Sequence, residues 1–174
     1  VGGFVANGFE KIKKSFEEII AQAPDSGAAI SIWHKGENVV NLWGGLADRD
    51  SKGAWNEETK VVVFSSTKGL MSLALAQLFQ AGKMSYEDLV IKYWPEYQGA
   101  GKEKTTIGQL VSHQAGVPFF AEDIKTDQVI NWNYMISQIE QEAPMWVPGS
   151  EYAYHAITHG WLTGELIRRV TGMS

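Results

Sequence analysis

The 174-residue sequence contains no cysteine, and this absence excludes disulfide bonds, thiolate zinc sites and cysteine nucleophiles together. No apolar run approaches the ~20 residues of a membrane-spanning helix. The N-terminal stretch also lacks a basic segment followed by an apolar core and a small-residue cleavage site. These absences predict a soluble chain and favour a cytoplasmic location, although a signal peptide already removed would leave the same pattern.

Positive charge is also scarce. Fifteen lysines and arginines face 20 aspartates and glutamates, for a net charge of -5, and basic residues gather only at 11–14 and 168–169. A nucleic-acid or anionic-membrane partner requires a stronger basic patch, so neither is expected. The 44% hydrophobic and 20% charged content is typical of one folded domain with a sizeable core.

The first 60 residues predict a helix and a hairpin. Apolar residues recur at helical spacing from Phe9 to Ile20, and this helix should end before Pro24 and pack against a sheet. Two β-rich runs flank residues 35–38, which predicts an antiparallel hairpin whose second strand ends or bulges at Gly44-Gly45. Residues 47–60 are expected to form a loop.

The remainder predicts mainly helices. Apolar residues cover nearly every face of 67–81, which indicates a buried central helix that stops at Gly82. Capping-box patterns predict one helix that begins at Tyr86 and ends at Pro95, and a second helix that begins at Ile107. Apolar spacing predicts two more helices, over 127–142 and 156–170, with Gly172 as the cap of the last.

The tetrapeptide Ser65-Ser66-Thr67-Lys68 lies between the apolar run VVVF and the predicted central helix. Residues three apart share a helix face, so the lysine amine can approach the hydroxyl of Ser65. A serine hydroxyl is a weak nucleophile at neutral pH and needs such a base. Ser66 is the weaker candidate, because Gly69 stands three residues after it and has no side chain to accept a proton.

The order of elements and motifs resembles the serine β-lactamase-like superfamily, specifically the class C β-lactamase-related esterases called family VIII carboxylesterases. The resemblance spans nearly the whole chain. It rests on VVVFSSTKGLMSLALAQLFQAGKMSYEDLVIKYWPEY, TTIGQLVSHQAGVP and VPGSEYAYHAITHGWLTGELIRRVTG. It implies an α+β fold of the β-lactamase/penicillin-binding-protein type, with an antiparallel sheet flanked by helices and a helical region.

On that resemblance, Ser65 is the acylated nucleophile, Lys68 its base or proton relay, and Tyr154 the second base. Tyr152 is the rival by proximity, but Tyr154 fits the family register better. Many relatives carry asparagine where this chain has Ala156, and that amide binds a substrate's amide carbonyl. Its replacement favours simple esters over β-lactams or peptides.

Four further residues are expected near the substrate. His155 adjoins the proposed site, with a structural role as the alternative, and Phe119, Phe120 and Trp146 lie in loops that flank it. The tryptophans at 43, 132 and 161 are expected in the core.

A metal site and a cofactor are not expected. His155 and His159 are four apart on the predicted last helix, a spacing that could place two ligands on one metal. Without a wider ligand motif the spacing is weak support, and His113 lies in a turn that resembles a structural turn of the family. The predicted chemistry uses neither a metal nor an organic cofactor.

The length departs from the family. Relatives continue past the tyrosine motif with further helices and three more strands, one of which supplies an oxyanion-hole N–H besides that of Ser65. Residues 1–174 are therefore expected to be the N-terminal part of one catalytic domain, with helix and hairpin in 1–60 and the helical region in 61–174. A longer chain or a second polypeptide would complete it.

The predicted function of the completed protein is hydrolysis of small carboxylic esters through an acyl-serine. The alternatives are a β-lactamase or D-amino-acid peptidase, or a catalytically silent interaction protein with the same fold.

Overall fold

The structure is a computed structural model that describes residues 1–173. It divides into two compact units, Val1–Val62 and Val63–Ser174, and each has its own hydrophobic core. The division falls within the apolar run that precedes Ser65.

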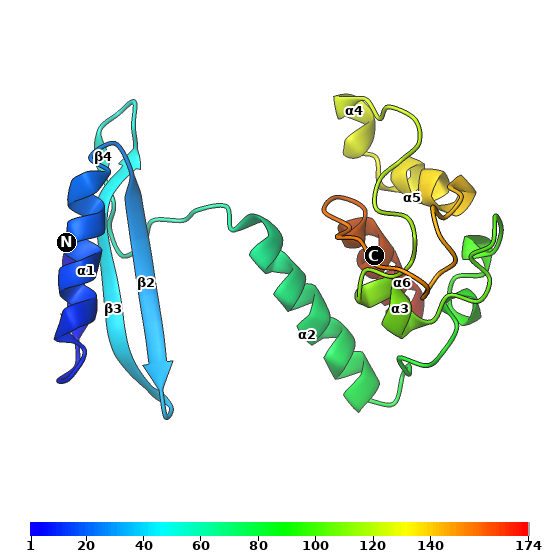
Figure 1. Cartoon of the computed structure of the whole chain (residues 1–174), viewed down its shortest axis with the longest axis horizontal. Helices are drawn as coiled ribbons and strands as arrows, with labels where there is room; N and C mark the ends of the chain where they lie inside the picture. The colour runs from blue at the N-terminus through cyan, green and yellow to red at the C-terminus, as the bar shows by residue number, and fades with distance from the viewer. Residues whose placement is uncertain (174) are drawn as a thin grey trace. The chain divides into compact units, whose positions relative to one another are not determined.

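The first unit contains an antiparallel sheet in the order β1-β3-β2, in which β2 and β3 are the long strands labelled in Figure 1. Its strands are β1 (Gly2–Val5), β2 (Gly27–His34), β3 (Glu37–Asp48) and β4 (Gly53–Ala54), the last of which pairs with the end of β3. Lys35 and Gly36 connect β2 to β3 with φ of 51° and 84°, as a two-residue hairpin turn requires. The predicted hairpin is therefore confirmed.

Two details of the sheet differ from the prediction. Gly44-Gly45 does not end the second strand, because β3 continues to Asp48. Gly45 has a φ of 84°, and a Cβ there would lie 2.2 Å from the carbonyl oxygen of Ser26, so only glycine fits. The short strands β1 and β4 were not predicted.

Helix α1 (Glu10–Gln22) lies along the sheet (Figure 1). Its buried residue Phe16 forms a core cluster with Val39, Val40 and Leu42 of β3. The helical spacing of the N-terminal apolar residues thus predicted both the helix and its packing.

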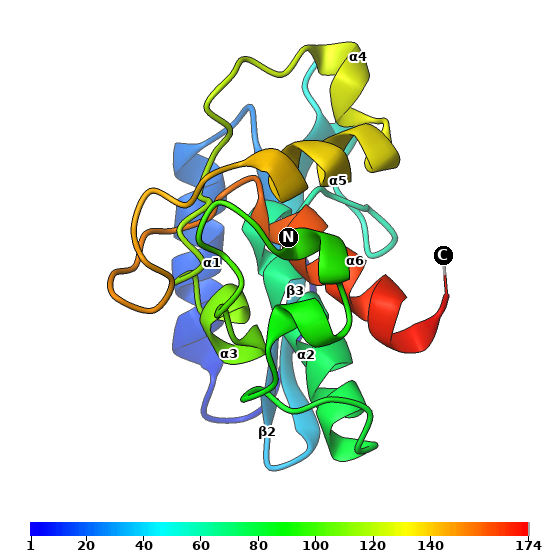
Figure 2. The ribbon, with the colours of Figure 1, turned by 90° about the vertical axis from the view of Figure 1, so that its right-hand side faces the viewer.

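The second unit is helical and is built around α6 (His159–Thr171), which packs against α2 (Thr67–Gln80), α3 (Ile107–Val111) and α5 (Trp132–Gln141) (Figure 2). Leu75, Leu110, Ile139 and Leu166 belong to its buried core. Shorter pieces complete it: the 3-10 turns η1 (Phe64–Ser66), η2 (Val90–Lys92) and η3 (Pro95–Tyr97), and helix α4 (Thr126–Val129). Among the described residues, no helix is both long and apolar enough to cross a membrane.

The predicted helix start at Ile107 is confirmed, and the one predicted at Tyr86 is wrong. Thr106 and Gln109 form a complete capping box at α3. Asp88 does accept a hydrogen bond from the Ser85 N–H at 2.8 Å, but the chain makes a turn there and continues into η2. Pro95 begins η3 and ends no helix.

Three other helix predictions need correction. The stretch 127–142 is broken into α4 and α5, because the Asn131 side chain accepts from the Tyr134 N–H and caps α5. Helix α6 begins at His159, three residues later than predicted, and Gly172 ends it at φ 69° as expected. Within α2 only Leu75 is buried, so this helix is not covered on every face.

Candidate active site

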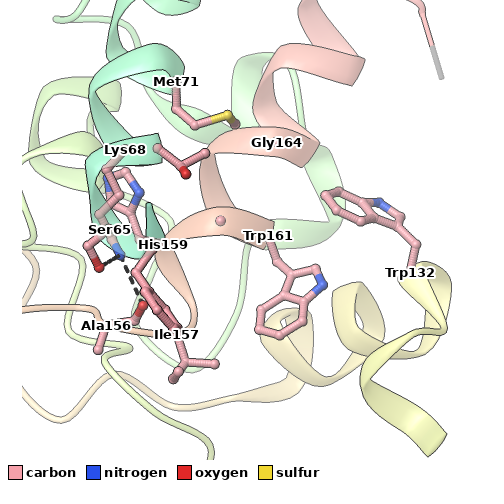
Figure 3. A pocket seen from close by; sticks show the side chains of 12 residues that line it. Ser65, Lys68, Met71, Trp132, Ala156, Ile157, His159, Trp161 and Gly164 are labelled. Atoms are coloured by element: carbon pink, nitrogen blue, oxygen red, sulfur yellow. Dashed lines mark hydrogen bonds between the residues drawn. The ribbon is translucent and has the colours of Figure 1, made fainter. Parts of the chain in front are cut away.

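Ser65 lies in η1, directly before α2, and Lys68 lies in the first turn of that helix. The Lys68 Nζ donates hydrogen bonds to Ser65 Oγ at 3.1 Å and to the carbonyl oxygen of Ala156 at 3.0 Å (Figure 3). The second bond ties the amine to the segment that precedes α6, so its position does not depend on Ser65 alone. Proton exchange between Ser65 and Lys68 requires no rearrangement.

Phe64 precedes Ser65 with a φ of 45°, in the left-handed region that a non-glycine residue rarely adopts. Such conformations persist only where the surrounding structure imposes them, and they are frequent at functional sites. The turn presents Ser65 at the surface at the start of α2.

Tyr154 is the tyrosine that the structure brings to this pair. The Lys68 Nζ lies 4.9 Å from the centre of the Tyr154 ring. Hydrogen bonding with Ser65 and then with Lys68 lowers the pKa of the Tyr154 phenol. A lowered pKa suits a phenol that must exchange a proton near neutral pH. The rival residue Tyr152 is 74% exposed.

His113 holds the segment that carries Tyr154. Its backbone oxygen accepts from the Ala153 N–H at 3.3 Å, and its Nδ1 accepts from the His155 N–H at 3.1 Å. Its ring lies 4.9 Å from that of Tyr154, centre to centre. His113 therefore fixes both neighbours of the tyrosine. Sequence reasoning assigned it only to a structural turn.

His155 is fully buried and does not face a substrate. Its Nδ1 lies 2.7 Å from the Ala153 carbonyl oxygen, to which it donates, and its Nε2 accepts from the Val117 N–H at 3.1 Å. Burial lowers the pKa of His155, in agreement with this neutral tautomer. Because the protein uses both ring nitrogens, the proposed substrate contact is replaced by the structural alternative.

The two histidines are not spaced as ligands on one helix. His155 precedes α6, so its side chain is not one helical turn from that of His159, and both His155 ring nitrogens already bind protein groups. Within residues 1–173, no group of three or more histidine, cysteine, aspartate or glutamate side chains is placed to hold a metal ion.

A cavity of about 620 Å³ opens beside Ser65 and Lys68 (Figure 3). Its apolar wall includes Met71 of α2, Trp132 of α5 and Trp161 of α6. The two tryptophans were expected to be ordinary core residues. A usable signal was the pair of glycines at 160 and 164, four residues apart, which leaves space beside α6.

The loop aromatics expected near the substrate lie outside this cavity. Phe119 is 56% exposed, Phe120 packs against Trp161 with ring centres 6.2 Å apart, and Trp146 donates to the Gln114 carbonyl at 3.3 Å. None of the three lines the cavity beside Ser65. Periodicity could not predict this, because loop direction depends on tertiary contacts.

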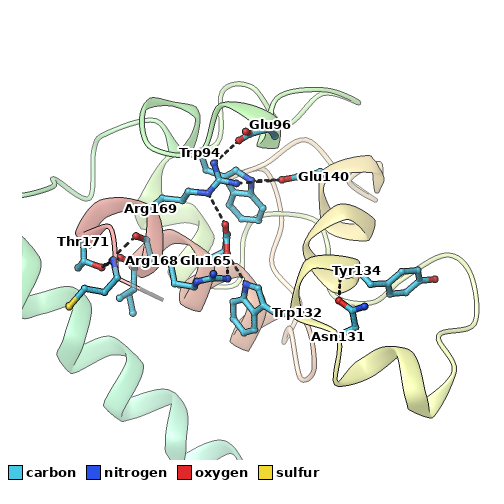
Figure 4. Close-up of polar contacts among 12 residues, drawn as sticks. Trp94, Glu96, Asn131, Trp132, Tyr134, Glu140, Glu165, Arg168, Arg169 and Thr171 are labelled. Carbon is cyan, nitrogen blue, oxygen red and sulfur yellow. Dashed lines mark hydrogen bonds and ion pairs between the residues drawn. The ribbon is translucent and has the colours of Figure 1, made fainter.

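Glu165 accepts a hydrogen bond from Trp132 (Figure 4). The indole N–H donates to Glu165 Oε2 at 2.8 Å, and Arg169 donates to Glu165 Oε1 at 2.7 Å. Burial alone would raise the pKa of Glu165, but hydrogen bonds from Arg169 and Trp132 and the nearby arginine charges lower it overall. The carboxylate thus stays ionised and orients the indole toward the cavity.

The site contains a serine in contact with a lysine one turn later, with a tyrosine from a distant loop beside them. A serine and lysine at this spacing occur in β-lactamases and penicillin-binding proteins. The Beta-lactamase family model matches residues 16–174, and the chain belongs to that family.

Relatives and solved structures agree with this assignment. The chain is 31% identical over 167 residues to the esterase/beta-lactamase LipL of Mycobacterium tuberculosis, covering 94% of this chain and 38% of LipL. It superposes on a family VIII carboxylesterase with a TM-score of 0.93 and 34% identity, over 98% of this chain and 46% of that one. A penicillin-binding protein homologue from Caulobacter crescentus gives a TM-score of 0.94 and 34% identity, over 99% and 47%.

These matches show the predicted fold, the β-lactamase/penicillin-binding-protein type. The chain spans less than half the length of each of these relatives. What the whole protein does is therefore a matter for proposal.

Proposed function

We propose that the protein to which this chain belongs hydrolyses small carboxylic esters, or transfers their acyl group, through an acyl-Ser65 intermediate. The observation that carries the proposal is the 3.1 Å contact between Lys68 Nζ and Ser65 Oγ, with Tyr154 beside both. The fold alone would not support it, because one fold hosts many functions.

The reaction follows from the three side chains. Ser65 Oγ attacks the ester carbonyl carbon, and its proton passes to a neutral Lys68 amine or to an ionised Tyr154 phenolate. The tetrahedral intermediate collapses, the alkoxide leaves, and the held proton neutralises it. Water then attacks the acyl-Ser65 carbonyl along the same path in reverse, which releases the acid and restores Ser65 Oγ–H.

Esters are favoured over β-lactams and peptides. Ala156 offers a backbone carbonyl to Lys68 but no side-chain amide to a substrate. A site without a hydrogen-bonding partner for an amide gains nothing from binding one. A family VIII carboxylesterase at 34% identity supports ester substrates, and a penicillin-binding protein homologue at the same identity supports the alternative.

Labelling with a fluorophosphonate, followed by intact-mass analysis and peptide mapping, tests the nucleophile. The complete protein should gain one adduct on Ser65, and the Ser65→Ala variant should gain none. Ser66→Ala is the matched control and should label like the wild type. An unlabelled wild type would support the catalytically silent alternative, and an adduct on Ser66 would move the nucleophile by one residue.

Substrate class is tested separately by kcat/KM for a short-chain nitrophenyl ester and for a penicillin. We expect the ester to be the better substrate by at least about 10²-fold, the scale of discrimination that a missing polar contact produces. A penicillin turned over as well as the ester would favour the β-lactamase alternative, for which the name of LipL is the supporting observation.

A further inference from the structure

The cavity beside Ser65 extends from the site between helices α2, α5 and α6. Along α6, the small residues Gly160 and Gly164 lie four positions apart and line it, and Ala156 lines it from the turn that precedes the helix. Residues four apart lie on one face of a helix, so they leave a continuous space there. Met71 and Trp132 face that space from the other two helices (Figure 3).

The cavity is apolar away from Ser65. Lys68 is the charged side chain among the described residues that line it, and it lies at the Ser65 end (Figure 3). His159 also contributes to the lining, but its pKa of about 4 leaves it uncharged at neutral pH. The volume of about 620 Å³ falls within the roughly 300–1,000 Å³ of small-molecule pockets.

We propose that this cavity binds the acyl group of the substrate, and that the group is a medium-chain aliphatic or aryl acyl group larger than acetyl. The proposal rests on the proposed function. After the alcohol leaves, the acyl carbon remains bonded to Ser65 Oγ, which lines the cavity. The acyl chain must therefore stay beside this opening until deacylation, and burial there removes its apolar surface from water.

Gly160 gives direct control of the cavity. A Cβ at Gly160 meets no atom within 4 Å, so a side chain can be added there without displacing a neighbour. Gly164 differs, because a Cβ there would lie 2.7 Å from Trp132 Cη2 and would displace the indole. Glycine replacement within a helix also favours the helix, so a Gly160 variant should fold.

The test measures kcat/KM of the complete protein for nitrophenyl acetate, butanoate and octanoate. In the wild type, kcat/KM should rise by about threefold to fourfold for each methylene that the cavity buries, until it is full. In Gly160→Leu, the octanoate-to-acetate ratio should fall at least tenfold. Gly160→Ala is the matched control, with one added carbon, and should lower the ratio much less.

A second variant changes the cavity in the opposite direction. Met71→Ala removes a side chain from the wall and should raise the octanoate-to-butanoate ratio. Unchanged ratios in both variants would overturn the proposal. A second substrate series keeps the acetyl group and varies the size of the alcohol. If Gly160→Leu lowers kcat/KM only in that series, the cavity holds the alcohol and the proposal is overturned.

Fluorophosphonate labelling of each variant separates the two proposals. A Ser65 adduct with unchanged acyl ratios would overturn the acyl site and leave the ester hydrolase standing. If the wild type forms no Ser65 adduct, both the ester hydrolase and the acyl site are overturned.

Discussion

At the scale of single residues, the site depends on one local and one distant relation. Ser65 and Lys68 are three positions apart, so their contact at 3.1 Å follows from helical geometry. Tyr154 reaches them from a loop almost ninety positions later, and His113 holds both of its neighbours. The pair could be predicted from spacing, whereas the support of the tyrosine could not.

His113 should act as a positioning residue, and His113→Ala should lower kcat/KM for a short ester by roughly tenfold to hundredfold, because small displacements of a catalytic group cost that much. His113→Asn should retain more activity, since asparagine tolerates a φ of 66° and its Oδ1 can accept from the His155 N–H. Thermal melts of both variants would show whether folding is intact. Equal losses in the two variants would mean that the acceptor is unimportant.

The same residue predicts a pH dependence. Burial, and then the charge of Lys68, lower the pKa of His113, so its ring is neutral at pH 7. Protonation at lower pH removes the Nδ1 acceptor and places a second positive charge near Lys68, and the rings of Tyr154, His155 and His159 face the same histidine. Activity should therefore fall as pH decreases through that pKa. The pH profile of kcat/KM for the wild type and for His113→Asn measures this. If activity falls at low pH in the same way in both, the loss belongs to the titration of another group.

At the scale of elements, side chains decide where helices begin and end. The Ser85 and Asp88 pattern makes its hydrogen bond, yet no helix follows, whereas the same pattern at Thr106 caps α3. A capping pattern satisfies the first N–H groups, but continued packing is needed to propagate a short helix. Sequence alone does not reveal which of the two segments has that packing.

Lys102 illustrates an element end that the sequence did not reveal. It is fully buried, and its Nζ donates to the carbonyl oxygens of Glu140, at 3.1 Å, and Glu142, at the C-terminal end of α5. Lys102→Met should lower the free energy of unfolding by about 1–3 kcal/mol, because two partly buried carbonyls lose their partner. Urea denaturation measures this, with the exposed Lys104→Met as a control expected within about 0.5 kcal/mol of the wild type. Equal stability of both variants would contradict the assignment.

At the scale of the whole molecule, α2 carries an apolar surface that its own unit leaves uncovered. Leu70, Leu73 and Phe79 are at least half exposed, although the sequence predicted a buried helix. Exposed apolar faces of this kind mark contact surfaces or aggregation liabilities. The relatives are more than twice as long as this chain, and the apolar spacing of α2 does not specify which segments pack on it.

Residues 1–174 produced alone should therefore bind a hydrophobic dye and turn over esters at least about 10²-fold more slowly than the complete protein. The expected rate loss reflects the oxyanion-hole donor that the family resemblance assigns to a strand outside residues 1–174, a group typically worth about 10²–10³ in rate. Dye fluorescence measures the first effect. Ester hydrolysis, normalised to the concentration of Ser65 that reacts with fluorophosphonate in a parallel sample, measures the second. Equal turnover by the isolated segment would show that these residues suffice for the chemistry.

The sequence by itself determined the hairpin, α1, the start of α3 and the Ser65–Lys68 pair, because each depends on residues a few positions apart through periodicity, turn chemistry or capping. Only the tertiary structure decided that His155 is buried, that Phe119, Phe120 and Trp146 avoid the cavity, and that Trp132 and Trp161 line it. These outcomes depend on how loops and helices far apart in the chain meet, and local sequence patterns carry no information about such contacts.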